Sequence, residues 1–322
     1  MTNITRNPPS SVLENLQLLE ADLDSKIPFK KLDKNLLIAT WNIRSFGSLT
    51  RKWSSEEDDS PKRDLHSILC IAAIIKRFDV IAIQEVRANI RALRDTLKIL
   101  GNHWSLILTD VTKGDKGNGE RMAYLFDTRR VNLSGLACEL VVPQEWKDKD
   151  ISENALQTQF ARTPYAVSFK SCNHTFILIT LHILYGKKSQ ERIPELRAIA
   201  KWLSDWAGDV NAYHQNLITL GDFNIDERGD LLNKTFLKEG LYVPEQLQAK
   251  SATRSIFDET KYYDQIAWFK NSKSVPNLSM TFSNAGSYNF LQVAMENRKL
   301  EKRTISYMMS DHYPLWAEFK MC

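Results

Sequence analysis

The chain has 322 residues, of which 43% are hydrophobic and 25% charged, and its 43 Lys and Arg against 39 Asp and Glu give a net charge of +4. This composition excludes a disordered chain, and no apolar run approaches the roughly 20 residues of a membrane-spanning helix, so we expect no membrane insertion. The small positive excess tolerates a polyanionic partner without requiring one.

The N-terminal sequence lacks a basic start followed by an apolar core, so we expect no secretory signal. The four cysteines lack the CxxC spacing of metal sites and are interpreted as reduced thiols: Cys70, Cys138, Cys172 and Cys322. We therefore predict a cytoplasmic protein and expect it to be a monomer.

Residues 1–34 are polar and predict an outer arm or short helix, and residues 35–322 predict a single domain because no repeat or Pro/Gly linker divides them. In the first half, apolar runs predict strands at 36–41, 80–84, 104–111 and 122–126. Helical spacing of apolar residues predicts helices at 62–78 and 90–100, and 44–63 is a polar loop.

In the second half, strands are predicted at 136–142, 165–169 and 175–181, followed by a long helix at 190–206. The run LITLGDFNID, residues 217–226, predicts a buried strand that ends in an acidic turn. Residues 230–247 are interpreted as helix and loop, and further strands are predicted at 262–269 and directly after SDHYP. The stretch 271–307 is weakly patterned, with a charged ENRKLEKR run that predicts a solvated helix.

Polar side chains stand at the ends of these predicted strands. Strands paired in a sheet bring their ends to one rim, so residues distant in sequence can meet there. The set comprises Asn42, Glu85, Glu120, His182, Asp222, Asn224, Asp264, Asp311 and His312. Carboxylate and amide oxygens suit a hard cation such as Mg²⁺ or Mn²⁺, and the two histidines can move protons near neutral pH. The pattern favours a hydrolase of phosphate esters; Asp226 is interpreted only as a cap of the turn.

The motifs WNIR, IQEVR, GERMAYLF, LITLH, GDFN, YDQI and SDHYP occur in the order found in the endonuclease/exonuclease/phosphatase superfamily. Over residues 36–319 the chain resembles the DNase I-like branch of that superfamily. The resemblance implies an α/β fold in which two packed, mainly antiparallel sheets are flanked by helices as a four-layer sandwich. It also implies Mg²⁺ or Mn²⁺ as cofactor, with Ca²⁺ as a structural ion.

Carried over residue by residue, the resemblance implies that Glu85 is the main metal ligand. Asn42, Asp222, Asn224 and Asp311 would help to bind metal and phosphate. His182 with Glu120 and His312 with Asp264 would be the acid and base couples. Arg87 and Arg162 fall where such proteins place phosphate-contacting arginines.

His312 held by Asp264 suits the base and His182 the acid or a phosphate clamp, although the reverse allocation stays open. The leading hypothesis is a metal-dependent nuclease that cleaves DNA, or RNA, with little sequence preference. The alternatives are a phosphodiesterase or phosphatase for lipid headgroups or small esters, and a non-catalytic binding module on this fold. Nucleic acid is thus the expected partner, and Lys187 and Lys188 are candidate phosphate contacts beyond His182.

Substrate choice is expected to depend on loops held by the scaffold. The four long loops are predicted at residues 45–62, 114–119, 143–163 and 271–307.

Overall fold

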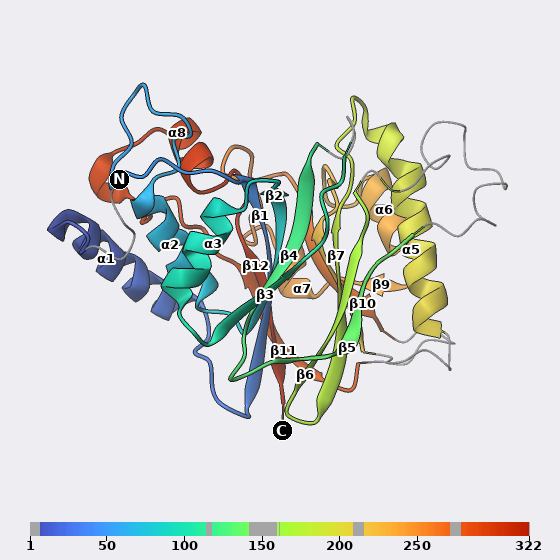
Figure 1. The fold of residues 1–322 in the computed structure, drawn as a ribbon. Coiled ribbons are helices and arrows are strands. Elements are labelled where there is room, and N and C mark those ends of the chain that lie inside the picture. The colour runs from blue at the N-terminus through green and yellow to red at the C-terminus, as the bar shows by residue number, and fades with distance from the viewer. Residues whose placement is uncertain are drawn as a thin grey trace.

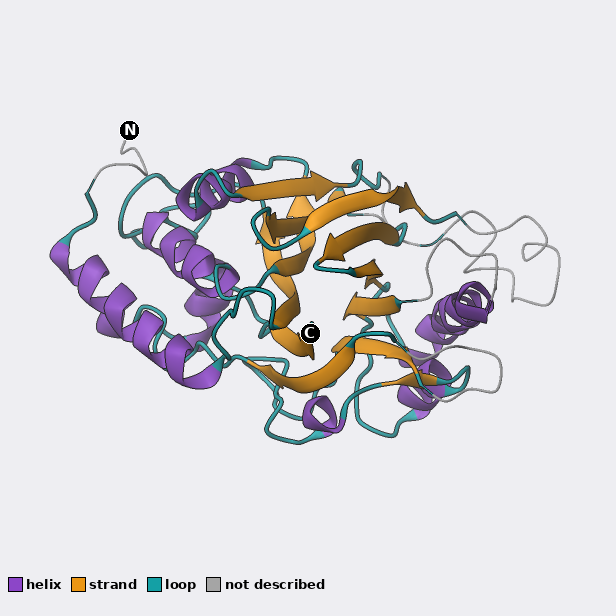
Figure 2. Cartoon of the chain, turned by 90° about the horizontal axis from the view of Figure 1, so that it is seen from below, coloured by secondary structure: helices purple, strands orange, loops and turns teal. Residues whose placement is uncertain are grey.

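The computed structural model describes residues 7–113, 118–141, 160, 162–208, 216–270 and 278–321. Two sheets pack face to face, and helices cover the outer face of each, so the layers run helix, sheet, sheet, helix (Figure 1). The view from below shows the strands as a central block between two groups of helices (Figure 2). The predicted four-layer α/β sandwich is confirmed.

The first sheet has six strands. In spatial order they are β11 (Thr281–Ser287), β12 (Leu315–Lys320), β1 (Asn35–Phe46), β2 (Val80–Arg87), β4 (Glu120–Asp127) and β3 (Trp104–Leu108). Only the β1–β2 pair in this sheet is parallel, and the other pairs are antiparallel.

The second sheet also has six strands. In spatial order they are β5 (Asn132–Glu139), β6 (Tyr165–Ser171), β7 (His174–His182), β8 (Leu217–Asp222), β10 (Asp264–Phe269) and β9 (Leu241–Tyr242). Its one parallel pair is β7–β8, so both sheets are mainly antiparallel, as the resemblance implied.

The helices lie on the two outer faces. On the side of the first sheet are α1 (Ser10–Lys26), α2 (Leu65–Ile75), α3 (Arg91–Leu100) and α8 (Lys302–Met308) (Figure 1). On the side of the second sheet are α5 (Ile193–Gly208) and α6 (Leu231–Leu237) (Figure 1). The short elements are α7 (Glu245–Gln248) and the 3-10 turns Ser189–Arg192 and Glu296–Arg298. Among the described residues, no helix combines the length and apolar character that crossing a bilayer requires.

Side-chain alternation along β1 explains why its residues 36–41 are apolar apart from Thr40. Leu36 and Ile38 face the core between the sheets, together with Phe169 and Leu220 of the second sheet. Leu37, Ala39 and Trp41 face the other way, into the core beneath α1 and α2. A central strand buried on both faces has no solvated side on which polar residues would alternate.

The two sheets also make a polar contact through their core. Gln84 Nε2 on β2 donates to Thr180 Oγ1 on β7 at 2.8 Å, and it also contacts Thr40 on β1. All three side chains are fully buried. Because a buried polar group needs a partner, this contact favours one relative position of the two sheets. It lies close to the strand ends that carry the site.

Several predicted boundaries need correction. The strand predicted at 136–142 is β5, which begins four residues earlier, and neither β9 nor β11 was predicted as a strand. The ENRKLEKR run is not one helix, because Lys299 adopts a left-handed conformation (φ +49°) that ends the 3-10 turn before α8 begins. Much of two predicted specificity loops, 114–117 and most of 143–163, and residues 271–277 of a third lie outside the described residues.

Candidate active site

Neighbouring strands of the second sheet deliver three site residues to one point. His182 ends β7 directly beside Asp222 at the end of β8, and Asp222 lies opposite Asp264 at the start of β10. Gly221 allows this close approach, because a Cβ at that position would stand 2.2 Å from the carbonyl oxygen of Leu181. Its φ of +140° also lies in a region that side chains disfavour.

Asn42, at the end of the buried part of β1, connects the two sheets at this rim. Its Nδ2 donates to Asp222 Oδ2 at 2.9 Å and to Glu85 Oε1 at 3.2 Å. Asn42 Oδ1 is buried and has no hydrogen-bond partner among the described residues. An unpaired buried acceptor next to a carboxylate costs free energy, which a bound cation would offset.

Glu85 has a strained backbone. Its φ is +60°, in the left-handed region that a residue with a Cβ seldom adopts, and it falls in a register shift of β2 against β4. The backbone N–H of Ser45 donates to its Oε2 at 2.8 Å. The bulge therefore directs the Glu85 carboxylate to Asn42, away from the regular alternation of the strand.

His312 is firmly held. Its Nδ1 and Asp264 Oδ2 form a hydrogen bond of 2.7 Å, and its carbonyl oxygen accepts from Trp41 Nε1 at 2.8 Å. Burial lowers the pKa of His312, but Asp264, Asp222 and Asp311 together raise it well above its ordinary value. Burial raises the pKa of Asp264 to about 6, with His312 opposing the shift.

Ser310 fastens the SDHYP turn to β1. Its Oγ donates to the carbonyl oxygen of Asn42 at 2.6 Å and accepts from the N–H groups of Arg44 and His312, both at 3.1 Å. The sequence reasoning missed this fully buried residue. Its position next to Asp311 in the motif was the available signal, but a hydroxyl that binds backbone leaves no pattern in sequence.

His182 lies against Glu120 less tightly. Nδ1 of His182 is 3.1 Å from Glu120 Oε2, outside hydrogen-bond geometry, whereas Asn118 Nδ2 donates to Glu120 Oε1 at 2.6 Å. Burial raises the pKa of Glu120, but His182, Arg162 and Arg87 outweigh it and lower that pKa to about 2. Glu120 therefore stays ionised at neutral pH and favours one orientation of the imidazole ring.

Both predicted phosphate-contacting arginines converge on Glu120. Arg162 Nε lies 2.6 Å from Glu120 Oε2, and Arg87 Nη1 lies 3.5 Å from Oε1. Arg87 also donates to Ser45 Oγ and to the carbonyl oxygen of Asn118. Asn118 was another residue that the sequence reasoning missed.

Asp222 is the meeting point of both histidines. Its Oδ2 lies 3.6 Å from His182 Nε2 and 3.9 Å from His312 Nε2. Burial raises the pKa of Asp222, but His312 and His182 outweigh it and leave the pKa below its ordinary value. Asn224, at φ +49°, donates its backbone N–H to Asp222 Oδ1 at 2.9 Å and its Nδ2 to the carbonyl oxygen of Ile183.

Asp311 lies at the more open side of the site. Its Oδ2 is 3.6 Å from Arg44 Nη1, and Arg44 also donates to Ser306 Oγ and stacks on the Tyr307 ring. Arg44 is a further contact that was not predicted, although it belongs to the WNIR motif. All eleven predicted site residues thus lie along one rim.

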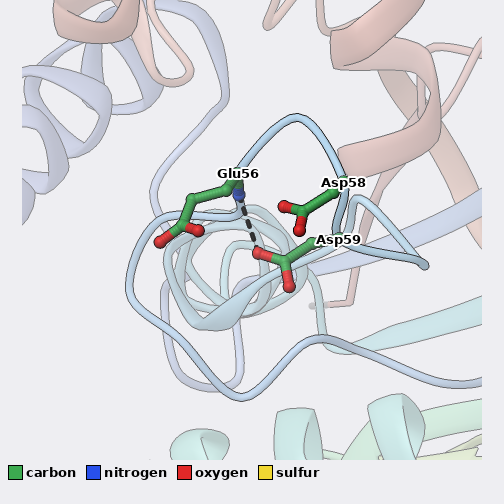
Figure 3. Close-up of side chains that lie close together, drawn as sticks. All are labelled: Glu56, Asp58 and Asp59. Carbon is green, nitrogen blue, oxygen red and sulfur yellow. Dashed lines mark hydrogen bonds between the residues drawn. The ribbon is translucent and has the colours of Figure 1, made fainter.

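The donors at this rim fit a hard divalent cation. Asn42 Oδ1 is an unpaired buried oxygen, Glu85 and Asp311 are partly exposed carboxylates, and no thiol is among them. A second acidic group, Glu56, Asp58 and Asp59, lies in the loop before α2 (Figure 3). Lys52 Nζ already contacts Asp59 there at 3.0 Å, and the group is largely exposed, so we assign it no metal.

The chain is similar in sequence to one protein family and to one curated protein. The profile described as "Endonuclease/Exonuclease/phosphatase family" matches residues 39–271. A curated protein named Deoxyribonuclease, from Thioalkalivibrio sp. (strain K90mix), is 27% identical over 297 residues, which cover 89% of this chain and 71% of that protein.

Solved structures share the fold at low identity. An endonuclease/exonuclease/phosphatase family protein from Bacteroides thetaiotaomicron is 17% identical with a TM-score of 0.56, covering 89% of this chain and 98% of that one. The human Nocturnin catalytic domain with bound sulfate is 14% identical with a TM-score of 0.57, covering 90% and 95%. D. rerio TDP2 complexed with a single strand DNA product is 14% identical with a TM-score of 0.54, covering 88% and 98%.

Proposed function

The chain belongs to the endonuclease/exonuclease/phosphatase family of phosphoester hydrolases, and from that membership we propose that it is a divalent-metal-dependent nuclease that cleaves DNA with little sequence preference. The observation that carries the proposal is the convergence of two histidines, each beside its own carboxylate, on Asp222. Phosphodiester hydrolysis needs a group to take a proton from water and another to help the departing oxygen.

We assign the base to His312. Because Asp264 binds its Nδ1, the neutral imidazole would keep the lone pair on Nε2, the nitrogen that faces Asp222. His182, held by the ionised Glu120, would act as the acid at the leaving oxygen. Asp264, Asp222 and Asp311 raise the pKa of His312, and Asp311 would share its charge with a bound cation, so cation binding would oppose that shift.

Glu85, Asn42 and Asp311 would hold the cation, which we propose to be Mg²⁺ or Mn²⁺. A bound cation of this kind neutralises charge on the phosphoryl oxygens and polarises the phosphorus. Asn224 donates through its backbone to Asp222, and this contact keeps the Asp222 carboxylate in place between the histidines. Arg87 and Arg162 offset the negative charge of the ionised Glu120, and they would face the non-bridging phosphate oxygens.

DNA is the proposed substrate for two reasons. The curated relative is named a deoxyribonuclease, and one structurally similar protein is described in complex with a single strand DNA product. The basic residues beside the site, among them Lys187 and Lys188, are compatible with a phosphate backbone.

The test is a substrate panel. Purified protein is incubated with plasmid DNA, single-stranded DNA, RNA, bis-p-nitrophenyl phosphate and sphingomyelin in Mg²⁺, Mn²⁺ or EDTA. We expect DNA cleavage with either metal and none in EDTA. Hydrolysis of sphingomyelin or small esters without cleavage of any nucleic acid would contradict the nuclease proposal and support a phosphodiesterase instead. Activity that survives EDTA would refute the proposed dependence on a divalent metal.

A further inference from the structure

A cavity of about 520 Å³ is lined by residues that follow or precede the strand ends of the candidate active site. It begins three residues after His182, at Tyr185, and its other wall includes Asp226, two residues after Asn224. Lys261, three residues before Asp264, lies on the same cavity. The cavity is therefore built from the continuations of three strand ends that supply the site, and we call it the Tyr185 pocket.

A buried arginine fixes the wall of this pocket. Arg192 is 3% exposed, donates to the carbonyl oxygens of Tyr185 and Asn224, and lies 3.0 Å from Asp226 Oδ1. Ser189 Oγ donates to the other oxygen of Asp226 at 2.6 Å. Asp226, which the sequence predicted only as a turn cap, instead joins the pocket to the loop after β7. A rigid wall of this kind preorganises a binding surface.

An aromatic series leads from the pocket to His312. Tyr185 is 54% exposed, and the Arg192 guanidinium lies 4.3 Å from its ring centroid. The Tyr185 and Tyr263 rings form a T-shaped pair with centroids 6.4 Å apart, and the Tyr263 ring lies 5.5 Å from the imidazole of His312. An exposed ring supported from beneath by a cation offers a flat surface on which a nucleobase can stack.

The charges around the pocket suit a phosphate next to that ring. Lys187 and Lys188 are exposed at its edge, and Lys261 Nζ lies 5.8 Å from the Tyr263 ring. Three carboxylates also line the pocket. Asp226 is engaged by Arg192 and Ser189, Asp230 caps α6 by accepting from Asn233 N, and Glu227 is exposed.

We propose that the Tyr185 pocket binds the nucleotide adjacent to the scissile phosphodiester in an unpaired strand, with the base on Tyr185 and the next phosphate at Lys187 and Lys188. This inference rests on the proposed nuclease function and adds a strand preference to it. A paired base exposes only its edges in the grooves, whereas stacking on a side chain needs an unstacked base. The chain would therefore favour single-stranded substrates and frayed ends.

The experiment compares pocket variants with a matched charge control. The pocket variants are Tyr185→Ala, Tyr185→Phe and the double variant Lys187→Ala/Lys188→Ala. The control is Lys170→Ala/Lys320→Ala, which removes the same charge from two exposed positions. Lys170 and Lys320 lie at the ends of β6 and β12 that are farther from the candidate active site. Binding of a fluorescein-labelled 12-nucleotide single strand and of its duplex is measured by anisotropy in EDTA, across a salt series.

We expect Tyr185→Ala to weaken single-strand binding about tenfold, since stacking on an aromatic ring is typically lost with alanine, and Tyr185→Phe to restore it. Duplex binding should change less. The lysine double variant should reduce the slope of log K against log[salt] by about 0.7 for each lost phosphate contact. With Mg²⁺, the ratio of kcat/KM on a tetranucleotide to that on p-nitrophenyl methyl phosphate should fall about tenfold in Tyr185→Ala and in Lys187→Ala/Lys188→Ala, but not in Tyr185→Phe. The control should match wild type.

Each failure has its own signature. If wild type binds and cleaves DNA but the pocket variants behave like the control, the pocket is not a nucleotide subsite and the nuclease function stands. If Tyr185→Ala weakens single strand and duplex equally, and Tyr185→Phe does not restore binding, the strand preference is wrong. If wild type neither binds nor cleaves any nucleic acid, the proposed function itself fails and this inference with it.

Discussion

Asn42 and Asp222 form a 2.9 Å hydrogen bond that crosses from the first sheet to the second at the rim where their strands end. Asn42 Nδ2 donates to both Asp222 and Glu85, so its Oδ1 is the atom that can bind a cation. One side chain thus fixes both the joint between the sheets and the orientation of a candidate metal ligand.

Replacing this amide by a carboxylate should make stability depend more on metal. Asn42→Asp places a buried negative charge against Asp222 and Glu85, so we expect a melting temperature several degrees below wild type in EDTA. Because the added charge favours a cation, the rise in melting temperature on adding Mg²⁺ should exceed that of wild type. Asn42→Ala should show the smallest rise. An equal Mg²⁺ response in all three proteins, measured by calorimetry, would refute Asn42 as a metal contact.

The acid and base can be told apart by the leaving group. The p-nitrophenolate ion needs no proton to depart, whereas a DNA alkoxide does. We expect His312→Ala to lower kcat by about 10²–10⁴-fold on both DNA and bis-p-nitrophenyl phosphate, and His182→Ala to do so only on DNA. If the two variants exchange these patterns, the allocation is reversed; full activity of either on DNA would contradict the site itself.

The left-handed backbone of Glu85 should be visible in stability. Glu85→Gly and Glu85→Ala both remove the carboxylate, and both should abolish metal-dependent activity. Since a Cβ is disfavoured at φ +60°, Glu85→Gly should be more stable than Glu85→Ala by about 1 kcal/mol. Urea unfolding followed by circular dichroism measures the difference. Equal midpoints, or a more stable alanine variant, would show that the bulge relaxes when the carboxylate is lost.

His66 should limit acid stability. It lies on α2 with its Nε2 2.9 Å from Asn15 Oδ1 of α1, and burial lowers its pKa to about 4, with Asp64 opposing the shift. The unfolded chain therefore binds the proton first, so stability is complete above about pH 6.5 and falls as pH drops toward 4. The loss is on the order of 3 kcal/mol by pH 4.

The variant His66→Gln keeps a donor for Asn15 but cannot titrate, so its free energy of unfolding should fall less between pH 6.5 and 4. The exposed His103 provides the control, and His103→Gln should follow wild type. Urea melts at pH 7, 6, 5 and 4 measure the effect. Parallel pH curves for wild type and His66→Gln would show that another group governs this range.

The site was accessible to sequence reasoning because the strands that supply it are central and apolar. β1, β7 and β8 are buried on both faces, so each appears as a run of apolar residues with a single Thr, and the run stops at its polar site residue. The strands that were misplaced or missed, β5, β9 and β11, lie at the edges of their sheets, and β5 and β11 have mostly exposed or half-buried residues. Their mixed composition resembles that of loops.

Other features depend on contacts that no local pattern encodes. The left-handed conformation of Glu85 results from the register shift between β2 and β4, and the sequence IQEVR resembles an ordinary strand. Ser310 and Arg44 act on backbone groups and on Asp311 across long sequence separations. The convergence of Arg87 and Arg162 on Glu120 likewise requires the folded sheet.

Gly221 makes the geometry of the site depend on the spacing between β7 and β8. Because a single methyl at this position would collide with the Leu181 carbonyl, β7 and β8 would have to separate, and His182 would move away from Asp222 with them. The position tolerates no side chain although it contributes none to the chemistry. Strand spacing is therefore a variable that redesign of this enzyme must hold constant, while the reactive groups around it are exchanged.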